Sequence, residues 1–119
     1  MMMIIWLLFA HWVADFVFQS DWMSKGKSKN NGILLTHCLT YGLVILFFII
    51  VKNPSKLFYP MLIFSSVVAI IHFPVDYVTS RINAKFWAEK RVHLFFVSIG
   101  FDQFIHGTTL ILIYRFFTF

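Results

Sequence analysis

The chain has 119 residues, a length that fits one domain. Hydrophobic residues make up 60% of it and charged residues 13%, against about a quarter charged residues in a typical soluble domain, which excludes an ordinary soluble protein. The net charge is +5, but the basic residues lie in short connections between apolar stretches rather than in a stripe interleaved with aromatic residues, which argues against nucleic-acid binding.

Four apolar stretches follow one another along the chain. The first covers residues 1–18 and lacks both the charged start and the small-residue cleavage site of a signal peptide, so we interpret it as a retained helix. The others cover residues 33–51, 57–78 and 94–117, each close to the ~20 residues that cross a bilayer. The sequence therefore predicts a single all-α domain over residues 1–119, a polytopic membrane protein built as a four-transmembrane-helix bundle.

The connections between these stretches differ in charge. Those at residues 19–32 and 79–93 share one face of the membrane and carry seven basic residues, against three on the other face. We expect the protein to lie in the inner (plasma) membrane. The positive-inside rule then places the first and third loops in the cytoplasm. The seven residues are Lys25, Lys27, Lys29, Arg81, Lys85, Lys90 and Arg91.

Histidine and aspartate recur inside the apolar stretches at a spacing of four residues, which puts two side chains on one helix face. An ionised group at this depth costs about 2.5–3.5 kcal/mol even on a lenient insertion scale, so such residues are usually functional. With a rise of about 1.5 Å per residue, groups on all four helices reach a similar depth near the cytoplasmic ends. The candidate site residues are His11 with Asp15, His37, His72 with Asp76, and Asp102 with His106.

Imidazole and carboxylate groups that face inward in a helix bundle are typical ligands of divalent metal ions. The seven candidates exceed the four ligands of a mononuclear zinc site, which leaves a two-metal centre or one metal whose histidines are oriented by carboxylates. Zinc is the first choice of metal, and Gln19 and Gln103 are expected to hydrogen-bond to its ligands. Two readings without a metal remain open, a proton relay and simple interhelical hydrogen bonding.

The basic loops offer a second kind of site. Lys25, Lys27 and Arg81 are expected to receive the anionic head group of a membrane lipid, although such clusters often only determine topology. Cys38 is the single cysteine, so no disulfide forms within the chain. A bundle this small is also compatible with a homo-oligomer.

The motifs HWVADFVFQSDWMSKGK, LLTHCLTY with His37, HFPVDY followed by Arg81, and FDQFIH span nearly the whole chain. Together they resemble a family of small bacterial and phage membrane proteins, domain of unknown function 3307 (DUF3307). The resemblance implies a multi-pass inner-membrane protein and no particular activity. A looser similarity connects the chain with membrane-bound metal-dependent hydrolases, which also have few spans and intramembrane His and Asp residues.

We therefore expect a metal-dependent hydrolase that acts on a lipid-linked phosphate or ester at the cytoplasmic face. One of Asp15, Asp76 and Asp102 would have to serve as the general acid or base, because no other candidate is visible. The alternative is a small membrane protein without enzymatic activity, which conducts protons or metal ions or binds and inhibits a host membrane protein.

Overall fold

The computed structural model describes residues 1–119, and it is helical with no strands, which confirms the all-α prediction. A π-helical turn, η1, directly continues the first helix, and a short helix precedes the first of the three long helices. The elements in chain order are α1 (Met2–Trp12), η1 (Val13–Val17), α2 (Asp21–Gly26), α3 (Asn31–Lys52), α4 (Phe58–Ala88) and α5 (Val92–Tyr114).

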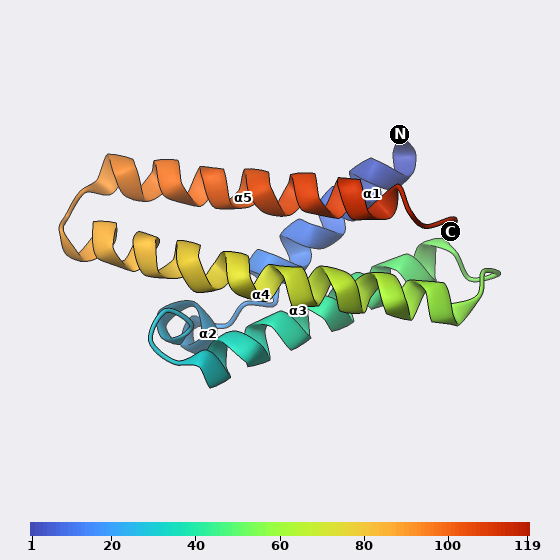
Figure 1. Cartoon of the computed structure of the whole chain (residues 1–119), viewed down its shortest axis with the longest axis horizontal. Coiled ribbons are helices and arrows are strands. Elements are labelled where there is room, and N and C mark those ends of the chain that lie inside the picture. Colours follow the sequence, from blue (N-terminus) through green and yellow to red (C-terminus); the bar gives the residue numbers. More distant parts are fainter.

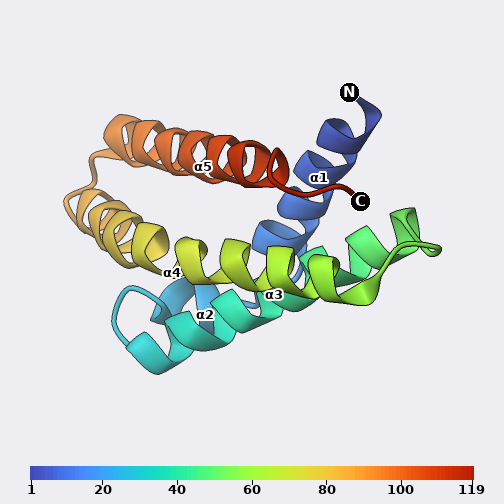
Figure 2. The same ribbon diagram turned by 45° about the vertical axis from the view of Figure 1, so that its right-hand side comes forward.

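The long helix α4 lies between α3 and α5 and packs against both, while α1 contacts α3 and α5 (Figure 1). Turning the molecule shows α1 running steeply across the other helices (Figure 2). The segment that contains α2 and the connection between α4 and α5 lie toward one end of the molecule, and the connection between α3 and α4 lies at the other. The two basic connections therefore share one end, as the alternation of spans predicts.

Three helices, α3, α4 and α5, are long and apolar enough to cross a membrane. Their outer surfaces are apolar, with Leu43, Ile70 and Phe104 exposed by 68%, 70% and 66%, as suits side chains that face lipid. The first predicted span is shorter than these three helices. Helix α1 has 11 residues and η1 has 5, so together they are only about 24 Å long. That length falls short of a hydrocarbon core about 30 Å thick.

Helix α4 is longer than predicted. Instead of ending near Val78 it continues to Ala88, so the connection to α5 is Glu89–Arg91 rather than residues 79–93. The extension contains no glycine or proline, and its polar side chains find partners on α5, as when Ser98 Oγ hydrogen-bonds to Asn83 Oδ1. Apolar composition marks where a segment can meet lipid, and it does not mark where the helix ends.

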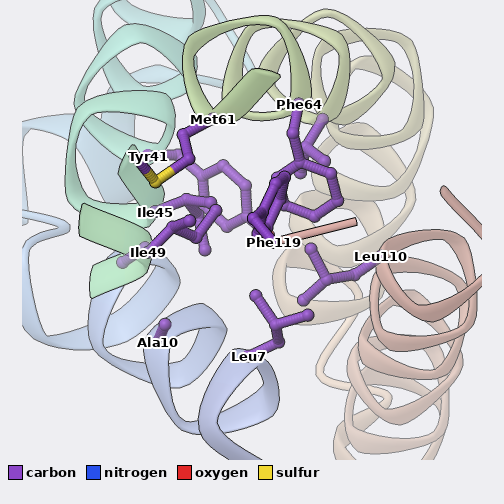
Figure 3. Close-up of a cluster of buried hydrophobic side chains, with 11 residues drawn as sticks. Leu7, Ala10, Tyr41, Ile45, Ile49, Met61, Phe64, Leu110 and Phe119 are labelled. Atoms are coloured by element: carbon purple, nitrogen blue, oxygen red, sulfur yellow. The ribbon is translucent and has the colours of Figure 1, made fainter. Parts of the chain in front are cut away.

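The interior is divided along the bundle. Apolar side chains fill the half near the α3–α4 connection, among them Ile45, Ile49, Phe64 and Leu110 (Figure 3). Tyr41 borders this apolar core, and beyond it the interior becomes polar. The buried histidines and aspartates thus have a rigid apolar core on one side and the basic connections on the other.

Helices α3 and α4 approach each other closely at Gly42. A Cβ atom at this position would lie 2.9 Å from the Cβ of Ala69, closer than two such atoms can pack. Because His37 on α3 and His72 on α4 flank this contact in sequence, the absence of a side chain at Gly42 helps to bring the two helices to the distance that the polar cluster requires.

We expect Gly42→Val to destabilise the folded protein by about 2 kcal/mol, because the added side chain forces α3 and α4 apart. Gly100→Val is the matched control, since a Cβ at Gly100 meets nothing within 4 Å and the change in helix propensity is the same. Thermal unfolding of both variants in detergent measures the difference. Equal stability of the two variants would contradict close packing at Gly42.

Candidate metal centre

All seven histidines and aspartates singled out from the sequence are buried, and five different elements bring them into one polar cluster. The exposed residues His93, Asp21 and Glu89 lie outside this cluster. The members are His11 from α1, Asp15 from η1, His37 from α3, His72 and Asp76 from α4, and Asp102 and His106 from α5.

The π-helical turn positions Asp15. In this turn the backbone N–H of Phe18 donates to the carbonyl of Val13, five residues back, so the helix is locally wider than an α-helix. Asp15 lies in the middle of the turn and is 3% exposed. Its carboxylate reaches His37 on α3 and His72 on α4, neither of which lies near it in sequence.

Four side-chain atoms stand at the spacing of ligands around one small ion. Nε2 of His37 lies 3.1 Å from Asp15 Oδ1, 3.1 Å from His72 Nε2 and 3.2 Å from Asp76 Oδ2. Nε2 of His72 lies 3.4 Å from each of the same two carboxylate oxygens. Ligands about 2.0–2.1 Å from a tetrahedral zinc ion are about 3.3–3.4 Å apart, so the observed spacing fits such an ion.

Hydrogen bonds alone do not account for this arrangement. A neutral imidazole carries one proton on one of its nitrogens, so His37 Nε2 can donate to a single acceptor. Three groups, from Asp15, His72 and Asp76, nevertheless surround that nitrogen within 3.2 Å. A cation at the centre of the four atoms would interact favourably with all of them at once.

A second group of candidate ligands adjoins the first. Asp15, Asp102 and His106 each offer an atom within 4.8 Å of the others. Nε2 of His106 lies 2.9 Å from Asp76 Oδ1 and 3.2 Å from Asp102 Oδ1, and Thr79 donates to the same Asp102 oxygen at 2.6 Å. Asp15 belongs to both groups, so a second ion would share a carboxylate with the first.

His11 lies outside both groups, although the sequence makes it an equal candidate. Its Nδ1 is 2.8 Å from the hydroxyl of Tyr41, and its Nε2 is 2.8 Å from Oε1 of Gln103. Gln103 in turn donates to Asp15 Oδ2 at 2.8 Å and to Asp102 Oδ2 at 3.1 Å. Gln103 therefore holds the two carboxylates, as expected of it, and His11 holds Gln103.

Gln19 makes no hydrogen bond to the candidate ligands, and its Oε1 atom is buried without a partner. Two residues that sequence reasoning did not select, Tyr41 and Thr79, touch the cluster. Both could have been found by helical spacing, because Tyr41 follows His37 by four residues and Thr79 follows Asp76 by three.

The sequence predicts that Lys27 is free to bind a lipid head group, but the structure shows it in contact with the cluster. The loop after α2 carries its Nζ into the cluster, where it lies 2.7 Å from Asp76 Oδ2, and the side chain is only 15% exposed. Burial lowers the pKa of this ammonium, but the carboxylates of Asp76 and Asp15 outweigh that effect and hold the pKa above its ordinary value of 10.5. Lys27 is therefore a permanent positive charge inside the cluster.

The two other predicted head-group residues remain near the surface. Arg81 stacks on the ring of Tyr77 at 3.6 Å from its centroid and donates to Oδ1 of Asn31 at 3.0 Å, so it connects α4 with the start of α3. Lys25 lines a cavity of about 760 Å³ that opens beside the cluster. Asp15, Asp102 and Gln103 line the same cavity, so it gives access to the cluster.

Fold and cluster together define the class, an all-helical membrane protein whose helices enclose a buried group of histidines and aspartates. The chain belongs to the family described as "Protein of unknown function (DUF3307)", whose model matches residues 3–119, which confirms the resemblance seen in its motifs. Searches of curated proteins and of solved structures found no match.

Replacing Lys27 measures how much its positive charge stabilises the folded protein. We expect Lys27→Gln to destabilise the metal-free protein by about 3–5 kcal/mol, because it removes the ammonium group that contacts the buried Asp76 carboxylate. Since folding raises the pKa of Lys27, this contribution is complete below pH 10.5 and is lost as the pH rises above that value. Thermal unfolding of wild type and variant across this range is the measurement.

The control for this comparison is Lys29→Gln, which removes an exposed lysine from the same loop. It should leave the unfolding temperature unchanged at every pH. A Lys27→Gln protein as stable as the Lys29→Gln protein at neutral pH would show that the ion pair with Asp76 contributes nothing.

Proposed function

We propose that this protein is an integral membrane metalloprotein that binds a divalent cation, zinc in first place, through Asp15, His37, His72 and Asp76. We further propose that it is a hydrolase that acts at the cytoplasmic face on a lipid-linked phosphate or ester. The observation that carries the proposal is the spacing of 3.1–3.4 Å between the two histidine nitrogens and from each of them to both carboxylate oxygens, which fits a single tetrahedral ion.

The charges of the cluster support one ion rather than two. Asp15, Asp76 and Asp102 bring three negative charges into the apolar bundle, and Lys27 brings one positive charge. Histidines that bind a metal do so in the neutral form, so one divalent cation together with Lys27 balances the three carboxylates. A buried group of charges is stable only when it is compensated in this way.

A catalytic metal site keeps a position open, whereas four protein ligands fill a tetrahedron. Asp15 is the ligand best placed to yield, because it alone among the four lines the cavity, and its second oxygen is already held by Gln103. A divalent cation held by these residues would lower the pKa of a bound water and polarise the bond to be cleaved.

Among the three carboxylates, Asp102 is the one suited to serve as general acid and base. It is not one of the four tetrahedral ligands, and it lines the cavity. Thr79 donates to its Oδ1 and Gln103 to its Oδ2, so the carboxylate is held in one orientation. It can therefore accept a proton from water and return it to a leaving group within the cavity.

A second candidate function is a proton relay without a metal. It is favoured by the pairing of Lys27 with Asp76, which compensates one carboxylate without any ion, and by the continuous contacts among the cluster side chains. These contacts run from Tyr41 through His11 and Gln103 to Asp15. Such chains of ionisable groups carry protons in membrane transporters.

Metal content decides between the two functions. Full-length protein purified in detergent and dialysed against zinc should contain one zinc per chain, measured by mass spectrometry of the metal. His37→Ala and His72→Ala should each lose most of it, because each removes a ligand at the centre of the group. His93→Ala, which removes an exposed histidine outside the cluster, should keep it.

Wild-type protein that stays folded and binds no zinc, manganese, iron or nickel would refute the metalloprotein. In that case proton flux into liposomes, lost in Asp76→Asn, would support the relay. Two ions per chain would instead assign the second ion to the group of Asp15, Asp102 and His106.

Asp102→Asn should retain its zinc but lose hydrolysis of a lipid-linked phosphate by about 10²–10⁴-fold, because the amide cannot accept a proton. Release of phosphate from substrate in mixed micelles is the measurement. Asp21→Asn, which changes an exposed acid on α2, is the control and should leave the rate unchanged. A fully active Asp102→Asn enzyme would exclude Asp102 as the acid and base.

A further inference from the structure

The cavity of about 760 Å³ lies between the segment around α2 and the facing ends of α4 and α5. In Figures 1 and 2 this is the end at which α2 and the α4–α5 connection lie. Its volume is in the range of about 300–1,000 Å³ that is usual for small-molecule sites. Basic, apolar and unpaired polar side chains line it, and together they indicate the kind of ligand that it holds.

One part of the lining is basic. Lys25 and Lys29, from α2 and the loop after it, line the cavity together with the hydroxyl-bearing residues Ser24 and Ser28. Lys27 lies between the two lysines in sequence and is committed to Asp76. Lys25 and Lys29 make no ion pair within the chain, so two positive charges at the cavity remain available to an anion.

Another part of the lining is apolar. Trp87 near the end of α4 and Phe95, Phe96 and Ile99 on α5 form it. Trp87 and Phe95 pack together with their ring centroids 5.0 Å apart, whereas Phe96 is 62% exposed. A cavity lined by both lysines and large apolar side chains suits a ligand with an alkyl chain and an anionic head, because each part can then meet groups of matching polarity.

The lining of the cavity also includes buried polar atoms that lack partners. Ser80 is 7% exposed, and its Oγ makes no hydrogen bond, and Oε1 of Gln19 is likewise buried and unpaired. Each such atom costs about 1–3 kcal/mol unless a ligand or water satisfies it. The Ser80 hydroxyl can donate a hydrogen bond to an oxygen of a ligand, and Gln19 Oε1 can accept one from a hydroxyl. A singly protonated phosphate monoester carries both an acceptor oxygen and a hydroxyl.

We propose that the cavity binds an alkyl phosphate, an amphiphile whose phosphate monoester lies between Lys25 and Lys29 while its chain lies along Phe95, Phe96 and Ile99. This inference rests on the proposed hydrolase and narrows its substrate class from a lipid-linked phosphate or ester to a phosphate monoester. In this pose the phosphate monoester occupies the same cavity that Asp102 lines.

The reaction that follows is hydrolysis of the monoester. Water adds to phosphorus, the bond between phosphorus and the alkyl oxygen breaks, and the products are an alcohol and inorganic phosphate. Asp102 accepts the proton from water and returns it to the departing alkyl oxygen, so no other reactant is needed.

Binding of dodecyl phosphate to the full chain in dodecyl maltoside micelles tests the proposal, measured by titration calorimetry. Inorganic phosphate is the comparison ligand, and the micelles themselves supply the uncharged dodecyl chain. Dodecyl phosphate should bind saturably and at least about tenfold more tightly than inorganic phosphate, because only the amphiphile uses both the basic and the apolar parts of the lining. Equal affinity for the two ligands would assign the cavity to free phosphate and overturn the proposal.

Paired variants separate the cavity from the general basicity of the protein. The double variant Lys25→Gln, Lys29→Gln should weaken binding of dodecyl phosphate by about tenfold, because it removes both free charges of the basic part of the lining. Lys85→Gln changes a lysine on α4 near the same end of the molecule that does not line the cavity, and it should change binding by less than about twofold. Equal losses in the two proteins, or no loss in the double variant, would overturn the proposal.

The same titration distinguishes failure of this inference from failure of the hydrolase. It is carried out on zinc-loaded protein and on protein treated with a chelator, with zinc content measured in parallel. Lysine-dependent binding in a protein that takes up no zinc would support the cavity and refute the hydrolase. Zinc-loaded protein that binds dodecyl phosphate without dependence on Lys25 and Lys29 would overturn the cavity alone.

Discussion

Burial of three carboxylates inside an apolar helix bundle is the constraint on which the rest of this structure depends. Asp15, Asp76 and Asp102 are each no more than 6% exposed. Leaving such groups ionised and unpaired in a membrane interior is prohibitively costly, so every neighbouring element contributes a compensating group. Histidines come from four helical segments, amide and hydroxyl donors come from α4 and α5, and the loop after α2 contributes an ammonium group.

This constraint also explains the architecture around the cluster. The apolar core holds α1, α3, α4 and α5 together on one side of it, and the close contact at Gly42 brings α3 and α4 near enough for His37 and His72 to meet. The π-helical turn rotates Asp15 toward them. The end of the bundle beyond the cluster is less tightly packed, and the cavity lies there. Rigid packing and access to the cluster are thus separated along the helix axes.

Much of the fold and the membership of the cluster could be predicted from the sequence. Long apolar stretches predict helices because only a helix satisfies its own backbone hydrogen bonds in lipid. A spacing of four residues puts His72 and Asp76, or Asp102 and His106, on one helix face whatever the rest of the chain does. The end of α4 could not be predicted in this way, because helix continues wherever its polar side chains find partners on a neighbour.

The sequence by itself therefore determined which residues face the interior and at what approximate depth, since helix geometry is local and periodic. Only the tertiary structure decided which atoms meet. It selected Asp15, His37, His72 and Asp76 as the central group, left His11 beside it, and turned Lys27 from a surface charge into an internal one. These outcomes depend on how far apart the helices pack and on where a loop folds back, and no spacing along one chain segment contains that information.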